Sequence, residues 1–189
     1  MARTKAYERQ TVIQQAFAIF IARGYQSTSL SDLTSATGLN KKSLYNEFGN
    51  KESLFMVVLE DFIANERAQS GPLLREKPLG IDNIQAFFGY LFTHFSDSGC
   101  LLTLSLNESE SIPSISLALI DKTLLAVEKA FYLNLLAEPA FDDAQAQVLA
   151  RNFLALMQGY TSLCRSEMLR EHNRQHVNQF LDLVKAMAK

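Results

Sequence analysis

A short segment near the N-terminus carries side chains that can contact nucleic acid. Two amines can bind phosphates, while hydroxyl and amide groups can bond to phosphate oxygens or to the edges of bases. Leu44 and Phe48 have the spacing of a buried helix face, so the polar groups should share the outward face of one helix. The pattern predicts a DNA-reading helix whose contacting side chains are Lys41, Lys42, Ser43, Tyr45 and Asn46.

Another short helix is predicted directly before this one, and the two together form a helix-turn-helix. Gly38 and Gly49 each follow an apolar run, where glycine readily adopts the left-handed conformation that ends a helix. Side-chain oxygens before each helix can accept hydrogen bonds from its first N–H groups; the candidates are Thr28 or Ser29, then Asn40, then Asn50. The buried side of this small trihelical core is expected to consist of Leu30, Leu33, Leu39, Leu44 and Phe48.

The same stretch resembles the N-terminal signature of the TetR family of one-component bacterial regulators. It departs at Thr34, where alanine is usual, and at Lys42 and Glu47, where a small residue and a ring are commoner. These departures leave the expected fold intact but leave the base preference open. The matching residues are Gly24-Tyr25, Thr28-Ser29-Leu30, Gly38-Leu39, Leu44-Tyr45, Phe48 and Lys51-Glu52 before Leu54.

The resemblance implies an all-α regulator in which residues 1–50 form the helix-turn-helix domain. Residues 51–189 would form a helical domain that senses a ligand and dimerises. The family signature places Thr28, Ser29, Tyr45 and Lys51 at positions that contact the DNA backbone. The alternative is that Tyr45 only packs and that Lys51 is solvated. The expected partners are double-stranded operator DNA, a small-molecule effector and a second copy of the chain.

The charge distribution agrees with a DNA-binding head on an acidic body. Residues 1–51 hold seven Lys and Arg against three Asp and Glu, a balance of +4, whereas the other 138 residues have a balance of −6. Phosphate contact is therefore expected from the head alone, although chance unevenness is the alternative. Arg3, Lys5 and Arg9 can act as a mobile basic arm on the DNA backbone or form an ordinary solvated terminus.

The remaining sequence predicts helices and no convincing strand. Residues 51–69 should form the joint between the two domains, since this helix starts beside the DNA-reading helix and its apolar stripe must be buried further on. The segment 100–106 alternates like a strand but has no partner strand, so we expect a helix. The other helices are expected over 7–23, from 82 to before Gly99, over 113–138, from 142 or 143 onward, and through 177–187.

Thirteen Phe and six Tyr in 189 residues suit a pocket for an apolar or aromatic ligand, although such stripes more often form a core. The resemblance favours the pocket. Asn107, Glu108 and Tyr160 are the polar groups expected to orient the ligand. The apolar wall is expected to include Phe62, Phe88, Phe92, Leu104, Phe131 and Met157.

The last two helices carry sustained apolar stripes, and only 20% of the residues in the chain are charged. Such stripes, paired with their symmetry mates, can form a four-helix interface in a homodimer. The residues expected at that interface are Leu156, Leu163, Val177, Phe180, Leu181 and Val184.

Metal and catalytic sites are not expected. His172 and His176 share a helix face, but the zincin pattern needs Glu where Asn173 stands, so a solvated pair is favoured. Cys100 and Cys164 have no metal or redox spacing, which suits a reducing cytosol; Cys100 is either a redox sensor or a buried thiol. No apolar run is long enough to span a membrane.

The sequence therefore predicts a transcriptional regulator, with no cofactor, that a small molecule releases from DNA. Two alternatives remain: a helical ligand-binding or scaffold protein without operator binding, and a small helical enzyme. The intact basic helix argues against the first. The missing nucleophile elbow, phosphate loop and paired catalytic carboxylates argue against the second.

Overall fold

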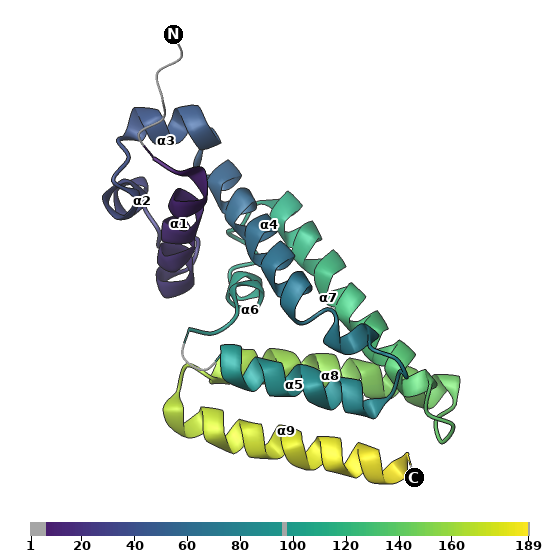
Figure 1. The fold of residues 1–189 in the computed structure, drawn as a ribbon. Coiled ribbons are helices and arrows are strands. Elements are labelled where there is room, and N and C mark those ends of the chain that lie inside the picture. The colour runs from purple at the N-terminus through teal and green to yellow at the C-terminus, as the bar shows by residue number, and fades with distance from the viewer. Residues whose placement is uncertain (1–6, 96–97, 189) are drawn as a thin grey trace.

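The computed structural model describes residues 7–95 and 98–188, which fold entirely into helices (Figure 1). Three short helices form one end of an elongated molecule. Two long helices, α4 and α7, run obliquely from that end to a layer formed by α5, α8 and α9. The bounds are α1 Arg9–Arg23, α2 Leu30–Thr37, α3 Lys41–Phe48, α4 Lys51–Gln69, η1 Leu73–Arg75, α5 Ile81–His94, α6 Leu101–Leu106, α7 Ser114–Leu136, α8 Asp143–Leu163 and α9 Glu167–Met187.

The all-α prediction is confirmed, and the helix bounds differ from the predicted ones by a few residues. The segment 100–106 forms helix α6 and not a strand, because its backbone groups pair within the segment. α1 begins at Arg9, two residues later than predicted, and α7 ends at Leu136, ahead of Pro139. Asp142 caps α8 and forms a reciprocal capping box with Gln145.

One hydrophobic core extends through the molecule. Val12, Ala16 and Phe20 of α1 pack with Leu54 and Phe55 of α4, and all five are buried. Farther along, a cluster of rings joins α5, α7 and α8: Phe88 stacks on Phe131, and both rings lie about 6 Å from Phe153. α4 therefore belongs to both packing units, since the rings of Phe55 and Phe62 lie against α1 while α6 and α7 also pack on this helix.

A buried polar residue anchors the loop that precedes α5. Asn134 of α7 is fully buried; its Oδ1 accepts hydrogen bonds from Gly80 N and Asn83 Nδ2 at 3.1 and 2.9 Å. Its Nδ2 donates to the carbonyl of Leu74 at 2.9 Å. Because a buried amide without partners would be strongly destabilising, this network fixes η1 and the start of α5 against α7.

Candidate DNA-binding face and internal cavity

Local capping sets the geometry of the helix-turn-helix. Ser29 caps α2 and forms a capping box with Asp32, whose carboxylate accepts from the Ser29 N–H at 2.8 Å. These hydrogen bonds lower the pKa of Asp32, with a smaller contribution from Arg23. Gly38 ends α2 with φ +66°, a left-handed conformation that favours glycine. The Asn40 side chain then accepts from Ser43 N at 2.9 Å, which fixes the start of α3.

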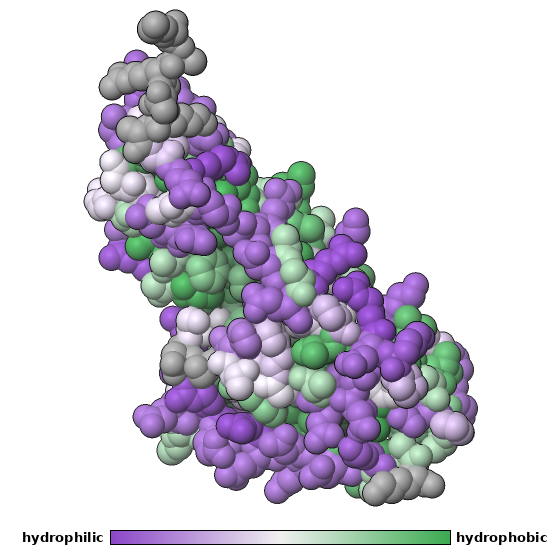
Figure 2. All heavy atoms as spheres, in the orientation of Figure 1, coloured by the Kyte–Doolittle hydropathy of each residue, from purple (hydrophilic) through white to green (hydrophobic). Residues whose placement is uncertain are grey.

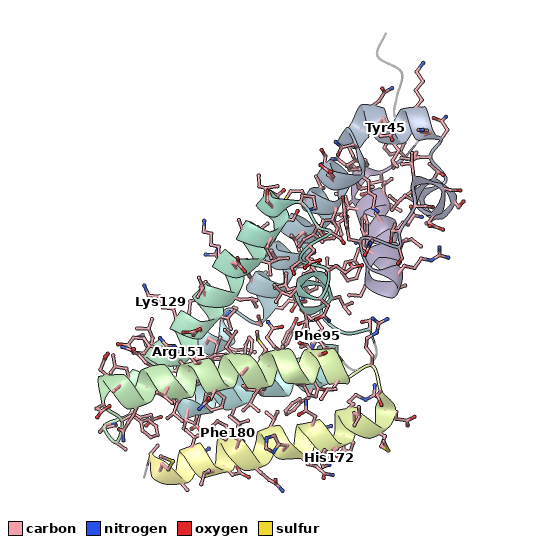
Figure 3. All side chains as sticks on the ribbon, turned by 180° about the vertical axis from the view of Figure 1, so that it is seen from behind. Tyr45, Phe95, Lys129, Arg151, His172 and Phe180 are labelled. Atoms are coloured by element: carbon pink, nitrogen blue, oxygen red, sulfur yellow. The ribbon has the colours of Figure 1, made fainter. Side chains whose placement is uncertain are left out.

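α3 presents the polar face that its sequence pattern predicted. Leu44 and Phe48 are buried, whereas Lys41, Lys42 and Asn46 are exposed. Tyr45 is 39% exposed, and the Lys41 ammonium lies 5.6 Å from the centre of its ring. Ser43 is half-buried. Tyr45 lies at the extreme end of the molecule (Figure 3), and Figure 2 shows mainly hydrophilic residues around that end.

The four residues predicted to contact the DNA backbone differ in accessibility. Thr28 is 1% exposed, and its hydroxyl donates to the carbonyl of Gly24, so its side chain supports the turn and does not face solvent. Ser29 is exposed but uses its hydroxyl in the capping box. The Lys51 ammonium lies 4.3 Å from the Tyr25 ring centre, and burial lowers the pKa of Lys51. Of these four residues, Tyr45 alone has an exposed side chain whose hydroxyl forms no hydrogen bond with a described residue.

The inner side of α3 is held by the start of the described chain. Tyr7 Oη donates to Glu47 at 2.8 Å, and Arg9 Nε lies 3.4 Å from the same carboxylate. The Arg9 guanidinium also covers the Phe48 ring at 5.3 Å. Arg9 therefore braces α3, which corrects its predicted role in a mobile arm. Arg3 and Lys5, the other members of the predicted arm, lie outside the described residues.

Glu108 contacts the DNA-binding head and not the cavity, which corrects its predicted role as a ligand-orienting group. Its carboxylate accepts from Tyr25 N at 2.6 Å and from Gln26 N at 3.1 Å. Both N–H groups belong to the turn between α1 and α2. Residues far apart in the sequence are thus joined by a direct contact between the α6–α7 loop and the helix-turn-helix.

A cavity of about 550 Å³ lies between α4, α5, α7 and α8, with η1 and α6 completing its wall. This volume is typical of small-molecule sites. Buried apolar side chains dominate the lining, and the exposed cations Arg67, Arg75 and Lys122 also border it. Figure 3 shows Phe95, one of the lining residues, in the region between α8 and α6.

Only part of the predicted ligand-binding set lines this cavity. Phe62 and Met157 do. Phe88, Phe131 and Tyr160 are fully buried in the ring cluster, and Phe92 packs edge-to-face on Tyr160 at 4.8 Å, so these four belong to the core. Asn107 is exposed at the end of α6, and Leu104 packs on the core without lining the cavity.

Sequence reasoning missed the polar side chains of the cavity wall. Glu66 lies four residues after Phe62 on α4, so the two residues share one helix face. This position of a carboxylate within an apolar stripe was the feature of the sequence that could have identified it. Removal from water raises the pKa of Glu66, and Tyr90 Oη donates to its carboxylate at 3.1 Å. Thr103 and Gln158 also line the cavity and share a 2.7 Å hydrogen bond, but no spacing in the sequence links them.

The two cysteines are shielded rather than activated. Cys100 borders the cavity, where desolvation raises the pKa of its thiol to about 11. Cys164 is fully buried, and burial raises its pKa as well. A thiol that stays protonated near neutral pH reacts slowly, so the structure favours the buried-thiol interpretation over a redox sensor.

The predicted dimer residues divide between the core and the surface. Val177, Leu181 and Val184 are at most 2% exposed within the single chain, so they hold α9 on its own core and cannot form an interface. This corrects the prediction for those three. Phe180 lies between α9 and α8 (Figure 3), with its ring 5.3 Å from Phe153. Leu156 is half-buried, and Leu163 is 40% exposed.

The described residues offer neither a metal-binding cluster nor a membrane-spanning helix. Within residues 7–95 and 98–188, no cluster of His, Cys, Asp and Glu has an arrangement that could hold a metal ion. His172 and His176 are exposed on α9. None of the helices formed by those residues combines the length and apolar character needed to cross a bilayer.

The arrangement defines a helix-turn-helix DNA-binding protein with a cavity-bearing helical domain behind the DNA-reading end. The family model "Bacterial regulatory proteins, tetR family" matches residues 12–58. The repressor DhaR of Mycobacterium sp. (strain GP1) is 26% identical over 97% of this chain and 92% of its own length. The repressor ComR of Escherichia coli (strain K12) is 44% identical, but over 32% of this chain and only 29% of its own length.

Solved structures share the complete fold. A cysteine-substituted form of the TetR family regulator CifR, in complex with a 26-base-pair double-stranded operator, superimposes with a TM-score of 0.77 at 23% identity, covering 98% of both chains. The reduced form of NemR from E. coli gives a TM-score of 0.75 at 22% identity, covering 90% of this chain and 95% of NemR.

Residues 12–58 thus carry the DNA-binding region of the TetR family of bacterial transcriptional regulators, and the full chain matches regulators of this family in sequence and fold. It is a DNA-binding regulator, and the family assignment confirms the prediction that it is not an enzyme.

Proposed function

We propose that the protein is a homodimeric repressor that a small, mainly apolar ligand releases from its operator. The observation that carries this proposal is the position of α4: its first residue follows α3 by three positions, and its later turns form one wall of the cavity. A ligand in the cavity would therefore contact the helix that supports DNA reading. The relatives DhaR and ComR are both named transcriptional repressors, which supports the sign of regulation.

The proposed DNA contacts come from the outward face of α3. Lys41 and Lys42 would bind phosphates or guanine edges, and Asn46 would read a base edge in the major groove. Tyr45 would contact a phosphate through its hydroxyl or a thymine methyl through its ring. Ser43, half-buried behind this face, is a weaker candidate. Thr28 and Ser29 would act mainly by fixing the start of α2.

The proposed dimer uses the outward faces of α8 and α9, at the end of the molecule far from α3 (Figure 1). Val148, Leu163, Leu183 and Met187 are 40% or more exposed there. Val148 and Met187 border the same shallow apolar hollow between the two helices. Pairing these faces across a two-fold axis would cover the apolar side chains and place two copies of α3 on one side of the dimer.

The proposed switch depends on the separation of the two α3 helices. Operator half-sites have a fixed spacing, so a small displacement of α4 that moves α3 can remove much of the binding free energy. The usual coupling between two such sites is about 1–3 kcal/mol, or roughly 5–150-fold in affinity. By linkage, operator DNA must weaken ligand binding by the same factor, which calorimetry on free and operator-bound protein would measure.

The first test is footprinting of the purified protein on the DNA that flanks its own gene. We expect protection of a near-palindrome, and Asn46→Ala should change which bases are preferred, with an effect of about 1–3 kcal/mol at the contacted position. Lys129→Ala, on the exposed side of α7, is the matched control and should leave the footprint unchanged. A protein that protects no segment, or that is a monomer at micromolar concentration, would contradict the proposal.

A further inference from the structure

If the cavity binds the effector, as in the proposed function, its polar groups define the chemistry of that ligand. Glu66 of α4 and Gln158 of α8 both contribute polar side chains to its wall. Glu66 Oε2 accepts from Tyr90 Oη, but Oε1 has no hydrogen-bond partner among the described residues. This half-buried carboxylate can therefore accept one more hydrogen bond from inside the cavity.

Gln158 supplies the complementary group. Its Oε1 accepts from Thr103 Oγ1 at 2.7 Å, and Thr103 also bonds to Thr161 at 2.8 Å, which fixes the orientation of the amide. The Gln158 NH₂ group has no acceptor within residues 7–95 and 98–188. The wall thus offers one unused acceptor and one unused donor within a mainly apolar lining.

The charges around the cavity disfavour ionic ligands of either sign. Arg67, Arg75 and Lys122 border it from its exposed side, and none of the three forms an ion pair with a described residue. A ligand of either sign would meet repulsion from one of these groups as well as attraction from the other, and its charge would lose hydration inside a mainly apolar lining. An uncharged molecule avoids both repulsions.

We propose that the effector is an uncharged amphiphile: an apolar or aromatic body with an O–H or N–H group that donates to Glu66. An oxygen on the same molecule would accept from the Gln158 NH₂. The apolar body would lie against Phe62, Leu91 and Met157, which line the cavity.

Four probes with a common body test this proposal: 4-butylphenol, its methyl ether 4-butylanisole, 4-butylbenzoate and 4-butylbenzylammonium. Calorimetry should show that the phenol binds most tightly, about tenfold or more over the ether, because the ether lacks the donor. Glu66→Leu should abolish the preference for phenol over ether. Glu60→Gln, an exposed glutamate on the same helix, should retain it.

Tighter binding of the ammonium or of the benzoate than of the phenol would overturn the proposal, and so would equal affinities for phenol and ether. Binding of none of the four would overturn it as well. Operator binding by the same preparations is measured in parallel, because loss of that activity would contradict the proposed function and not the ligand class.

A separate contact connects the wall of the cavity with the DNA-binding helices. The Glu108 carboxylate holds two consecutive backbone N–H groups, of Tyr25 and Gln26, just before α2. The Glu108 backbone is itself fixed, since its carbonyl accepts from Ser111 N and Ile112 N at 2.8 and 3.1 Å. Hydrogen bonds from N–H groups to a carboxylate are stronger than neutral ones.

Gly24 packs tightly against the Glu108 carboxylate at this contact. Gly24 has φ +79°, and a Cβ built there would lie 2.6 Å from Glu108 Oε1. The short helix that precedes Glu108, α6, contributes Leu102 and Thr103 to the cavity wall. This six-residue helix therefore touches the cavity in its first turn and is followed two residues later by the contact with the DNA-binding head.

We infer that Glu108 is a positioning residue that ties the turn before α2 to the cavity wall, so that a displacement of α6 changes the placement of α2 and α3. α4 and α6 then provide two connections between the cavity and the DNA-binding head.

The test compares Glu108→Ala and Glu108→Gln with Glu110→Ala, an exposed glutamate in the same loop. In Glu108→Ala, amide hydrogen exchange at Tyr25 and Gln26 should accelerate about tenfold and operator affinity should fall by a similar factor. Glu108→Gln keeps an acceptor oxygen and should restore part of both, while Glu110→Ala should match the wild type.

Unchanged exchange at Tyr25 and Gln26 in Glu108→Ala would overturn this inference. Faster exchange that spreads evenly over all helices would also overturn it, because that pattern indicates general destabilisation. If Glu108→Ala does not fold, Glu108→Gln carries the same measurement: operator affinity and local exchange equal to the wild type would show that the carboxylate charge does not position the turn.

Discussion

In the helix-turn-helix, the side-chain bonds that begin each helix join residues only three positions apart: Ser29 with Asp32, Asn40 with Ser43, and Asn50 with Ser53. In the layers behind it, the defining polar contacts join residues 51 to 60 positions apart, such as Asn134 with Asn83 and Leu74. The first region is specified locally, whereas the second exists only after α5 and α7 have packed.

The same difference appears in two carboxylates whose pKa values move in opposite directions. Hydrogen bonds from Ser29 lower the pKa of Asp32, whose side chain is partly exposed. Desolvation raises the pKa of Glu66, which lies in the wall of the cavity. A local cap stabilises a charge, while burial by distant helices destabilises one.

The largest expected effect separates the two faces of α9. Leu181→Glu places a charge where the side chain is 2% exposed, so we expect the chain to lose its fold, with a loss of more than about 4 kcal/mol. Leu183→Glu, two positions away and 58% exposed, should keep its helical circular dichroism and sediment as a monomer. A folded Leu181→Glu monomer beside a dimeric Leu183→Glu would reverse the assignment of the two faces.

The next prediction decides what Lys51 does. If its ammonium contacts a phosphate, Lys51→Ala should weaken binding to all sequences alike and flatten the salt dependence of operator affinity by about one unit. Lys129→Ala, on α7 and far from α3 in Figure 3, should leave that slope unchanged. An unchanged slope for Lys51→Ala would restrict Lys51 to its observed contact with Tyr25.

A smaller effect is expected from Glu66. The pKa of Glu66 in the folded protein is raised above the ordinary value of 4.5, because the folded state favours the protonated carboxyl. This contribution to stability is fully present below pH 4.5 and is lost as the pH rises through the folded pKa. Glu66→Gln should therefore increase the free energy of unfolding at pH 7 and give little gain below pH 4.5. Urea unfolding at several pH values measures this, and a less stable variant at pH 7 would contradict it.

The smallest effect is expected from Asp32, with the opposite sign. Its folded pKa lies below the ordinary value of 3.8, so its stabilising contribution is present above that pH and is lost as pH falls through the folded pKa. Asp32→Asn should be less stable than the wild type at pH 7, and the difference should shrink on acidification. A difference that stays constant down to pH 2 would show that the Asp32 charge does not stabilise the α2 cap.

The sequence alone determined the parts of this protein whose physics is local. The glycines at 38 and 49, the caps at Ser29, Asn40 and Asn50, and the spacing of Leu44 and Phe48 define α2, α3 and the start of α4. The outward face of α3 follows from the same periodicity, because turning one side of a short helix inward leaves the other side exposed.

Only the tertiary structure decided which apolar and charged residues form the cavity, the core and the junction. An apolar stripe does not reveal whether its partner is the same chain or a second copy, so Val177, Leu181 and Val184 were expected at an interface and lie in the core. Glu108 was expected to face a ligand, yet it binds N–H groups more than eighty positions away. Such pairings depend on how α4, α6 and α7 pack, and no short-range pattern encodes that packing.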